Sequence, residues 1–214
     1  ICLELASLYS DFTYDKQVEY AARALIISEE KSDRANIIAS LRHLTNAYYK
    51  LDNYEKAIEY ATRLYSIFNA EKNEIEAAHA LRSIGNSYYG WSKFVEAKDY
   101  FTRALNIFKK NQYFEGVAQT LGDIAMILGH WGEYDEALHK TQESLKFWEE
   151  IGNLEGIARS YNNIGSLYKD LGNLESAFEY FRKSLEIAEG RGNKAEIVNV
   201  TLHIGDIYLR KELY

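Results

Sequence analysis

The sequence of 214 residues contains no proline, a single cysteine and a single methionine. Because proline is the residue that most strongly interrupts a helix, its absence over this length favours long, unbroken helices. The lone cysteine, Cys2, excludes a disulfide within the chain and a zinc site built from cysteines, and it fits a reducing, cytoplasmic location. We therefore expect a helical protein that folds without disulfides or a structural zinc ion.

Long apolar runs and an excess of basic residues are also missing. The longest apolar runs fall well short of the roughly 18 residues that a membrane span needs, and no basic segment followed by an apolar one opens the sequence. The formal charge of −7 argues against nucleic acid as a partner, because proteins that bind phosphates usually present a basic face. We expect neither a membrane-bound nor a nucleic-acid-binding protein.

The sequence repeats itself with a constant period of 40 residues, and such self-similarity is typical of repeat architectures. One position of the period holds leucine once and then a small residue five times: Leu5, Thr45, Gly85, Ala125, Gly165 and Gly205. Three residues later, leucine or tyrosine recurs: Leu8, Tyr48, Tyr88, Leu128, Tyr168 and Tyr208. Twelve residues after the small position, alanine recurs with one exception: Gln17, Ala57, Ala97, Ala137 and Ala177. The chain is therefore predicted to consist of copies of one structural unit.

Each unit divides into two amphipathic stretches separated by short polar segments. Gly, Asn or Asp in these segments can take the left-handed conformation that ends a helix. The segments within units are 51–54, 91–94, 131–134 and 171–174, and those between units are 71–74, 111–114, 152–153 and 192–193. The pattern predicts eleven helices of roughly 12 to 18 residues, each unit forming a pair of helices.

Gly165 lies inside one of these predicted helices, where glycine costs about 1 kcal/mol relative to alanine. We predict that it lets the two helices of its unit approach closely. In this arrangement Gly165 faces Ala177, and Tyr168 and Phe181 pack around the contact.

The pattern resembles the tetratricopeptide repeat, whose consensus has a small residue at its eighth position, tyrosine at its eleventh, an aromatic residue at its seventeenth and alanine at its twentieth. Gly165, Tyr168, Leu174 and Ala177 occupy these positions, and the match covers essentially the whole chain. The period of 40 exceeds the usual length of about 34, and the proline that often closes the repeat is absent. This variant is similar to the repeats of LGN/Pins-type adaptors and of bacterial regulators in which the repeats adjoin an output domain.

The resemblance implies an all-α, right-handed solenoid of about five and a half helix-turn-helix repeats in a single domain, residues 1–214. The expected repeats are 1–33, 34–73, 74–113, 114–153, 154–193 and a partial repeat, 194–214. Neither end carries a polar cap, and Tyr214 corresponds to the first aromatic residue of a further helix. We therefore expect this sequence to be a segment of a longer protein, with uncapped ends that favour self-association.

In this family ligands usually lie in the concave groove lined by the first helix of each repeat. The resemblance thus implies a peptide-binding site formed by the residues at the groove positions: Arg42, Asn46, Tyr49, Lys50, His79, Arg82, Asn86, Tyr89, Gln119, Met126, Arg159, Asn162, Ser166 and Lys169. An Arg-x-x-x-Asn pair recurs at 42/46 and 82/86, and a spacing of four places both side chains on one helix face. Arginine can hold a carboxylate with two hydrogen bonds and asparagine can bond to a peptide group, which favours an extended, acidic peptide.

Other interpretations remain open. Arg42 and Arg82 can instead pair only with acidic neighbours on a solvated face, as surface arginines often do. Besides a scaffold that binds an acidic peptide, the chain can be the regulatory sensor region of a larger signalling protein (a cyclase, kinase or transcription regulator), or an oligomerisation module.

Catalysis and metal binding have little support in the sequence. Asp123, Met126 and His130 share one helix face, but two candidate ligands are too few for a metal site. No nucleophile has a base at a workable spacing, so we expect no enzyme activity and no cofactor.

Overall fold

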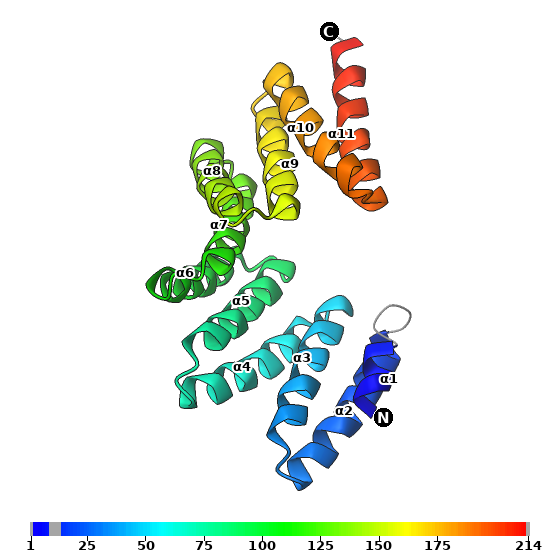
Figure 1. The fold of residues 1–214 in the computed structure, drawn as a ribbon, viewed down its shortest axis with the longest axis vertical. Helices are drawn as coiled ribbons and strands as arrows, with labels where there is room; N and C mark the ends of the chain where they lie inside the picture. The colour runs from blue at the N-terminus through cyan, green and yellow to red at the C-terminus, as the bar shows by residue number, and fades with distance from the viewer. Residues whose placement is uncertain (1, 9–13, 213–214) are drawn as a thin grey trace. The chain divides into compact units, whose positions relative to one another are not determined.

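The chain is all helical in a computed structural model that describes residues 2–8 and 14–212 (Figure 1). Within these ranges it forms eleven α-helices and no strand, which confirms the predicted all-α class. The helices are α1 (Cys2–Leu8), α2 (Tyr14–Glu30), α3 (Arg34–Lys50), α4 (Tyr54–Ala70), α5 (Glu74–Gly90), α6 (Phe94–Lys110), α7 (Phe114–His130), α8 (Tyr134–Glu150), α9 (Leu154–Asp170), α10 (Leu174–Arg191) and α11 (Lys194–Glu212). With 7 and 19 residues, α1 and α11 fall outside the expected range of lengths. Tyr214, expected to open a further helix, lies outside the described residues.

The helices group into two compact units, residues 1–111 and 112–214. In the first unit, α2, α3, α4 and α5 each pack against the next helix along the chain, and α1 packs against α2 and α3. In the second unit, α7, α8, α9 and α10 likewise each pack against the next helix. Each unit is thus a stack of helical hairpins held together by neighbouring elements, as expected for repeat proteins. The organisation as a single domain stays a prediction.

Three-residue linkers join successive helices from α2 to α10, and their middle residues have φ between 52° and 78°. These left-handed residues recur every 20 positions and include Gly192, which follows the slightly longer α10: Ser32, Asp52, Lys72, Ser92, Gln112, Gly132, Gly152, Gly172 and Gly192. The expectation of Gly, Asn or Asp holds for Asp52 and the four glycines, whereas serine, lysine and glutamine take this conformation in the other linkers.

The residue after the left-handed one ends one helix and starts the next. The backbone N–H of Asn53 donates to the carbonyl of Tyr48 at 2.9 Å, which closes α3. The side chain of Asn53 then accepts a hydrogen bond from the N–H of Lys56, which caps the N-terminus of α4. The linker therefore reverses the chain within a few residues and makes the two helices antiparallel.

The small residue at the repeated position makes room for a side chain from the second helix of the same hairpin. A Cβ atom on Gly165 would lie 2.9 Å from Cδ1 of Phe181, and one on Gly85 would lie 2.6 Å from Cε1 of Phe101. The prediction that Phe181 packs at this contact is confirmed. The Phe181 ring supplies the atoms nearest to Gly165, and the expectation that Gly165 faces Ala177 stays a prediction.

The positions that hold Gly85 with Phe101 and Gly165 with Phe181 are sixteen residues apart, and no hairpin has a large residue at both of them. The pairs are Leu5 with Ala21, Thr45 with Ala61, Gly85 with Phe101, Ala125 with Thr141 and Gly165 with Phe181. The second member of every pair is at most 1% exposed. Since interiors are close-packed, a large residue on one helix requires a small one on the other. In the two hairpins with glycine, the side chain that fills the contact therefore comes from the second helix.

Candidate functional site

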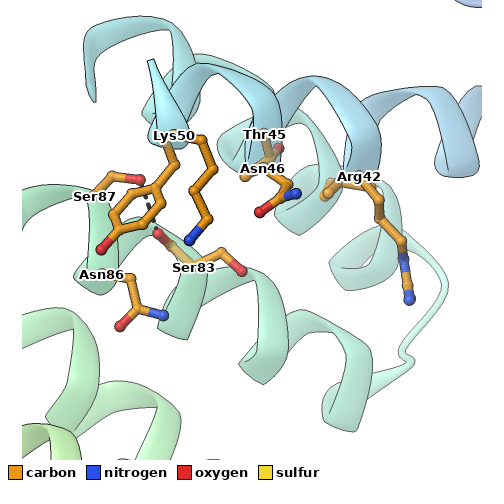
Figure 2. A pocket seen from close by; sticks show the side chains of 9 residues that line it. Arg42, Thr45, Asn46, Lys50, Ser83, Asn86 and Ser87 are labelled. Atoms are coloured by element: carbon orange, nitrogen blue, oxygen red, sulfur yellow. Dashed lines mark hydrogen bonds between the residues drawn. The ribbon is translucent and has the colours of Figure 1, made fainter. Parts of the chain in front are cut away.

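The first unit contains an open pocket of about 390 Å³ between α3, α4 and α5 (Figure 2). Nine residues line it: Arg42, Thr45, Asn46, Tyr49, Lys50, Leu64, Ser83, Asn86 and Ser87. We call this the α3/α5 pocket. The pocket is polar because α3 and α5 each turn a stripe of regularly spaced polar residues toward the other helix.

On α3 the stripe consists of Arg42, Asn46 and Lys50, which are four residues apart and share one helix face. All three are exposed. In Figure 2, Arg42 and Lys50 lie toward opposite ends of the pocket with Asn46 between them, and Ser83 and Asn86 of α5 lie across from this stripe. The pocket therefore has a cation at each end and amide groups in the middle.

The serine and threonine hydroxyl groups of the pocket are already bonded to their own helices. Thr45 donates to the carbonyl of Leu41 at 2.8 Å, Ser83 to that of His79 at 3.0 Å, and Ser87 to that of Ser83 at 3.0 Å. In contrast, within residues 2–8 and 14–212 no hydrogen bond involves the side chain of Asn46 or Asn86. The two amides are thus the groups best placed to bond a ligand.

Arg42 forms an ion pair with Glu76 from the first turn of α5, with Nη2 and Oε2 2.6 Å apart. Its guanidinium also lies 5.8 Å from the centre of the Phe68 ring. Glu76 lines an adjoining pocket of about 260 Å³, and Arg42 lines both pockets. The interpretation that Arg42 pairs with an acidic neighbour is therefore right for this arginine.

Lys50, at the other end, has no carboxylate partner among the described parts of the chain; its Nζ lies 5.9 Å from the centre of the Tyr49 ring. No carboxylate lines the α3/α5 pocket itself. Because Glu76 compensates the charge of Arg42, Lys50 is the cation of the pocket that has no carboxylate beside it, and its charge favours an anionic group there.

Four further predicted residues of the first unit are half-buried. Tyr49 lines the pocket and packs edge-on against Tyr54, with ring centres 5.9 Å apart. His79 lines only the adjoining pocket. Arg82 and Tyr89 line neither pocket, so the Arg82/Asn86 pair does not repeat the geometry of Arg42 and Asn46.

The predicted residues of the second unit lie on α7 and α9, and several have partners within the unit. Arg159 pairs with Glu155 at 3.0 Å. Lys169 pairs with Asp206 of α11 at 3.0 Å, and its hydrogen bond lowers the pKa of that carboxyl. Arg159 and Lys169 are thus already paired with carboxylates, whereas Lys50 in the first unit is not.

The other predicted residues of the second unit are amide, hydroxyl and apolar side chains. Gln119 donates to Glu115 at 3.2 Å, Met126 is exposed and Ser166 is half-buried. The Oδ1 atom of Asn162 is buried, and no described residue bonds to it. These side chains provide single polar contacts and no charged cluster.

A cluster of metal-ligating side chains and a membrane-spanning helix are both absent from residues 2–8 and 14–212. Within them no three His, Cys, Asp or Glu side chains come together as a metal would need, and no helix is both long and apolar enough to cross a bilayer. Asp123 is buried, while Met126 and His130 on the same helix are exposed.

Sequence reasoning missed Thr45, Leu64, Ser83 and Ser87 as pocket residues and Glu76 as the partner of Arg42. Ser83 and Ser87 carry the same spacing of four as Arg82 and Asn86, one position further along, so the spacing alone does not decide which face of α5 points to α3. Leu64 comes from a second helix of a repeat, whereas the groove positions all lie on first helices.

Comparisons with known proteins point to the same kind of helical repeat as the hairpins do. Residues 116–190 match the family model of the tetratricopeptide repeat. This part of the chain is therefore similar to the tetratricopeptide repeat family. The resemblance inferred from the sequence is thus confirmed, although no curated protein matches the chain.

Three solved structures show the same tetratricopeptide-type fold over most of the chain. BtubC from P. vanneervenii is 19% identical with a TM-score of 0.78, over 91% of this chain and 83% of that one. A signal transduction ATPase from Pyrococcus horikoshii with a tetratricopeptide repeat sensor is 16% identical (TM-score 0.77; 100% and 36% covered). The Rap conjugation gene regulator of plasmid pLS20, in complex with the Phr* peptide, is 22% identical (TM-score 0.65; 87% and 54% covered). This chain therefore spans about a third and about half of the latter two proteins.

Proposed function

We propose that this tetratricopeptide-type protein binds an extended, acidic segment of a partner protein in the α3/α5 pocket. The observation that carries the proposal is a pocket with a cation at each end and no carboxylate among its lining residues. An anionic side chain is the ligand group that such a pocket favours.

The groups between the two cations suit the backbone of a peptide. The side-chain amides of Asn46 and Asn86 come from facing helices, and each can donate to a peptide carbonyl and accept from a peptide N–H. Tyr49 adds an aromatic surface that is already held in place by Tyr54. The Rap regulator binds a peptide on the same fold, which supports peptide binding as the kind of task this architecture performs.

The experiment uses short fluorescent peptides of glutamate and serine, with glutamine in place of glutamate as the neutral control, and measures anisotropy. We expect binding of the glutamate peptide alone. Lys50→Ala should weaken it about fivefold, the effect of about 1 kcal/mol for an exposed charge pair. Lys31→Ala is the matched control, because Lys31 is exposed, carries the same charge and lies outside the pocket.

Two results would contradict the proposal. Equal binding of the glutamine peptide would show that charge is not recognised. Equal weakening by Lys31→Ala and Lys50→Ala would show that only the overall charge of the first unit matters.

A further inference from the structure

The two cations of the α3/α5 pocket differ in one respect: Arg42 already holds a carboxylate and Lys50 does not. The carboxylate of Glu76 occupies the Arg42 end with an N–O distance of 2.6 Å, while no described carboxylate pairs with Lys50. Arg42 thus already binds a carboxylate at this end of the pocket.

The separation of the two cations along α3 sets a length scale. Arg42 and Lys50 are eight residues apart, which corresponds to about 12 Å along a helix that rises about 1.5 Å per residue. In an extended peptide, each residue advances about 3.3 Å and side chains alternate between two faces. Two side chains four residues apart therefore lie on one face about 13 Å from each other, whereas two side chains two apart lie only about 7 Å from each other.

We propose, on the basis of the proposed function, that the pocket recognises two carboxylates four residues apart in an extended segment. One pairs with Lys50, and the other replaces Glu76 on Arg42. Glu76 then competes with the second peptide carboxylate for Arg42. This competition lowers the affinity of the site for the peptide.

The exposure of the ion pair permits this exchange. The side chains of Arg42 and Glu76 are 54% and 34% exposed, so Glu76 can turn into solvent without disturbing the core. Its replacement exchanges one ion pair for another of the same chemistry. The net gain from the Arg42 end is consequently smaller than that from the Lys50 end, where no protein pair has to be broken.

The first test compares peptides of identical composition that differ only in spacing. Each has two glutamates in a serine background, placed either two or four residues apart, and binding to the full chain is measured by anisotropy. We expect the four-residue spacing to bind about twofold more tightly, which is less than a full additional ion pair would give, because the second carboxylate has to replace Glu76 on Arg42. Equal affinity for the two spacings would overturn the two-carboxylate inference while leaving acidic-peptide binding intact. Binding of neither peptide would overturn both.

The second test removes the internal competitor. Glu76→Gln should raise affinity for the four-residue spacing about two- to fivefold, since Arg42 no longer has to leave a protein carboxylate. Glu74→Gln is the matched control: Glu74 lies in the same first turn of α5 and pairs with Lys110 at 2.7 Å, yet it lines neither of the two pockets that contain Arg42. Both variants change the net charge equally. An equal effect of the two substitutions would refute the role of Glu76 as competitor.

Discussion

The contact between Gly165 and Phe181 gives the sharpest stability prediction. In Gly165→Ala, the new Cβ atom would lie 2.9 Å from both Cδ1 and Cε1 of Phe181, well inside the ordinary carbon–carbon separation of about 3.5–4.0 Å. Overpacking of this kind costs about 1–3 kcal/mol. Against it stands the helix preference of alanine, which favours the variant by about 1 kcal/mol. We expect a net destabilisation of up to about 2 kcal/mol.

Gly122→Ala separates the two contributions. Gly122 also lies inside a helix of the second unit, but the nearest atom to a Cβ there is Oγ of Ser144 at 4.0 Å. This variant should therefore gain the helix preference alone, about 1 kcal/mol. The difference between the two variants in free energy of unfolding, from guanidinium titrations followed by far-UV circular dichroism, then gives the steric cost.

A double variant tests the size complementarity directly. Phe181→Thr removes the ring and recreates the residue found at Thr141, whose partner in the chain is Ala125. In that background Gly165→Ala should become stabilising by about 1 kcal/mol, because only the helix preference remains. The reasoning is refuted if Gly165→Ala stabilises the parent protein as much as Gly122→Ala does, or if its effect is the same with and without the ring of Phe181.

Two further predictions concern a linker and a histidine. Gly172 has a φ of 78°, and no neighbouring atom lies within 4 Å of the place that a Cβ would take. In the same titrations, Gly172→Ala should therefore lower the free energy of unfolding by about 1–2 kcal/mol through backbone strain alone. Gly172→Asn should lower it less, because asparagine adopts the left-handed conformation more readily. Burial lowers the pKa of His43 below its ordinary value of 6.5, so the folded state binds fewer protons than the unfolded state near that pH and stability should fall as the pH drops through 6.5. His43→Asn, which introduces the residue that Asn163 supplies at the same position of a later repeat, should flatten this decline in unfolding midpoints measured across the pH range; an unchanged slope would contradict it.

Most of the fold could be predicted from the sequence because its signals are local and repeated. A helical hairpin of 40 residues carries its own turn signals, and copies of the small and aromatic positions reinforce one another. The prediction of Gly, Asn or Asp in the left-handed linker positions was wrong for some linkers, where the neighbouring helices override the preference of the residue. Lys72 and Gln112 adopt the left-handed conformation despite their side chains, because helices of 17 residues on both sides fix the linker.

The candidate site was less predictable because it depends on contacts between helices. The stripe of Arg42, Asn46 and Lys50 follows from spacing along one helix, and the structure brings these three residues into one pocket. The ion pair of Arg42 with Glu76 joins residues 34 positions apart, and no pattern along a single helix reveals it. Similarly, which face of α5 turns toward α3 is set by the packing of the whole hairpin.

The size complementarity described for Gly165 and Phe181 has a consequence for how such a chain can grow. Both members of each pair lie within one hairpin, sixteen residues apart. A duplication of one 40-residue block therefore copies the large residue together with the small one that accommodates it. Each new copy therefore keeps this contact intact, and a substitution at one member of the pair needs compensation only at its partner in the same block. Gene duplication can thus lengthen the protein without disturbing this contact. Different hairpins can then hold different residue pairs at it, such as glycine with phenylalanine or alanine with threonine.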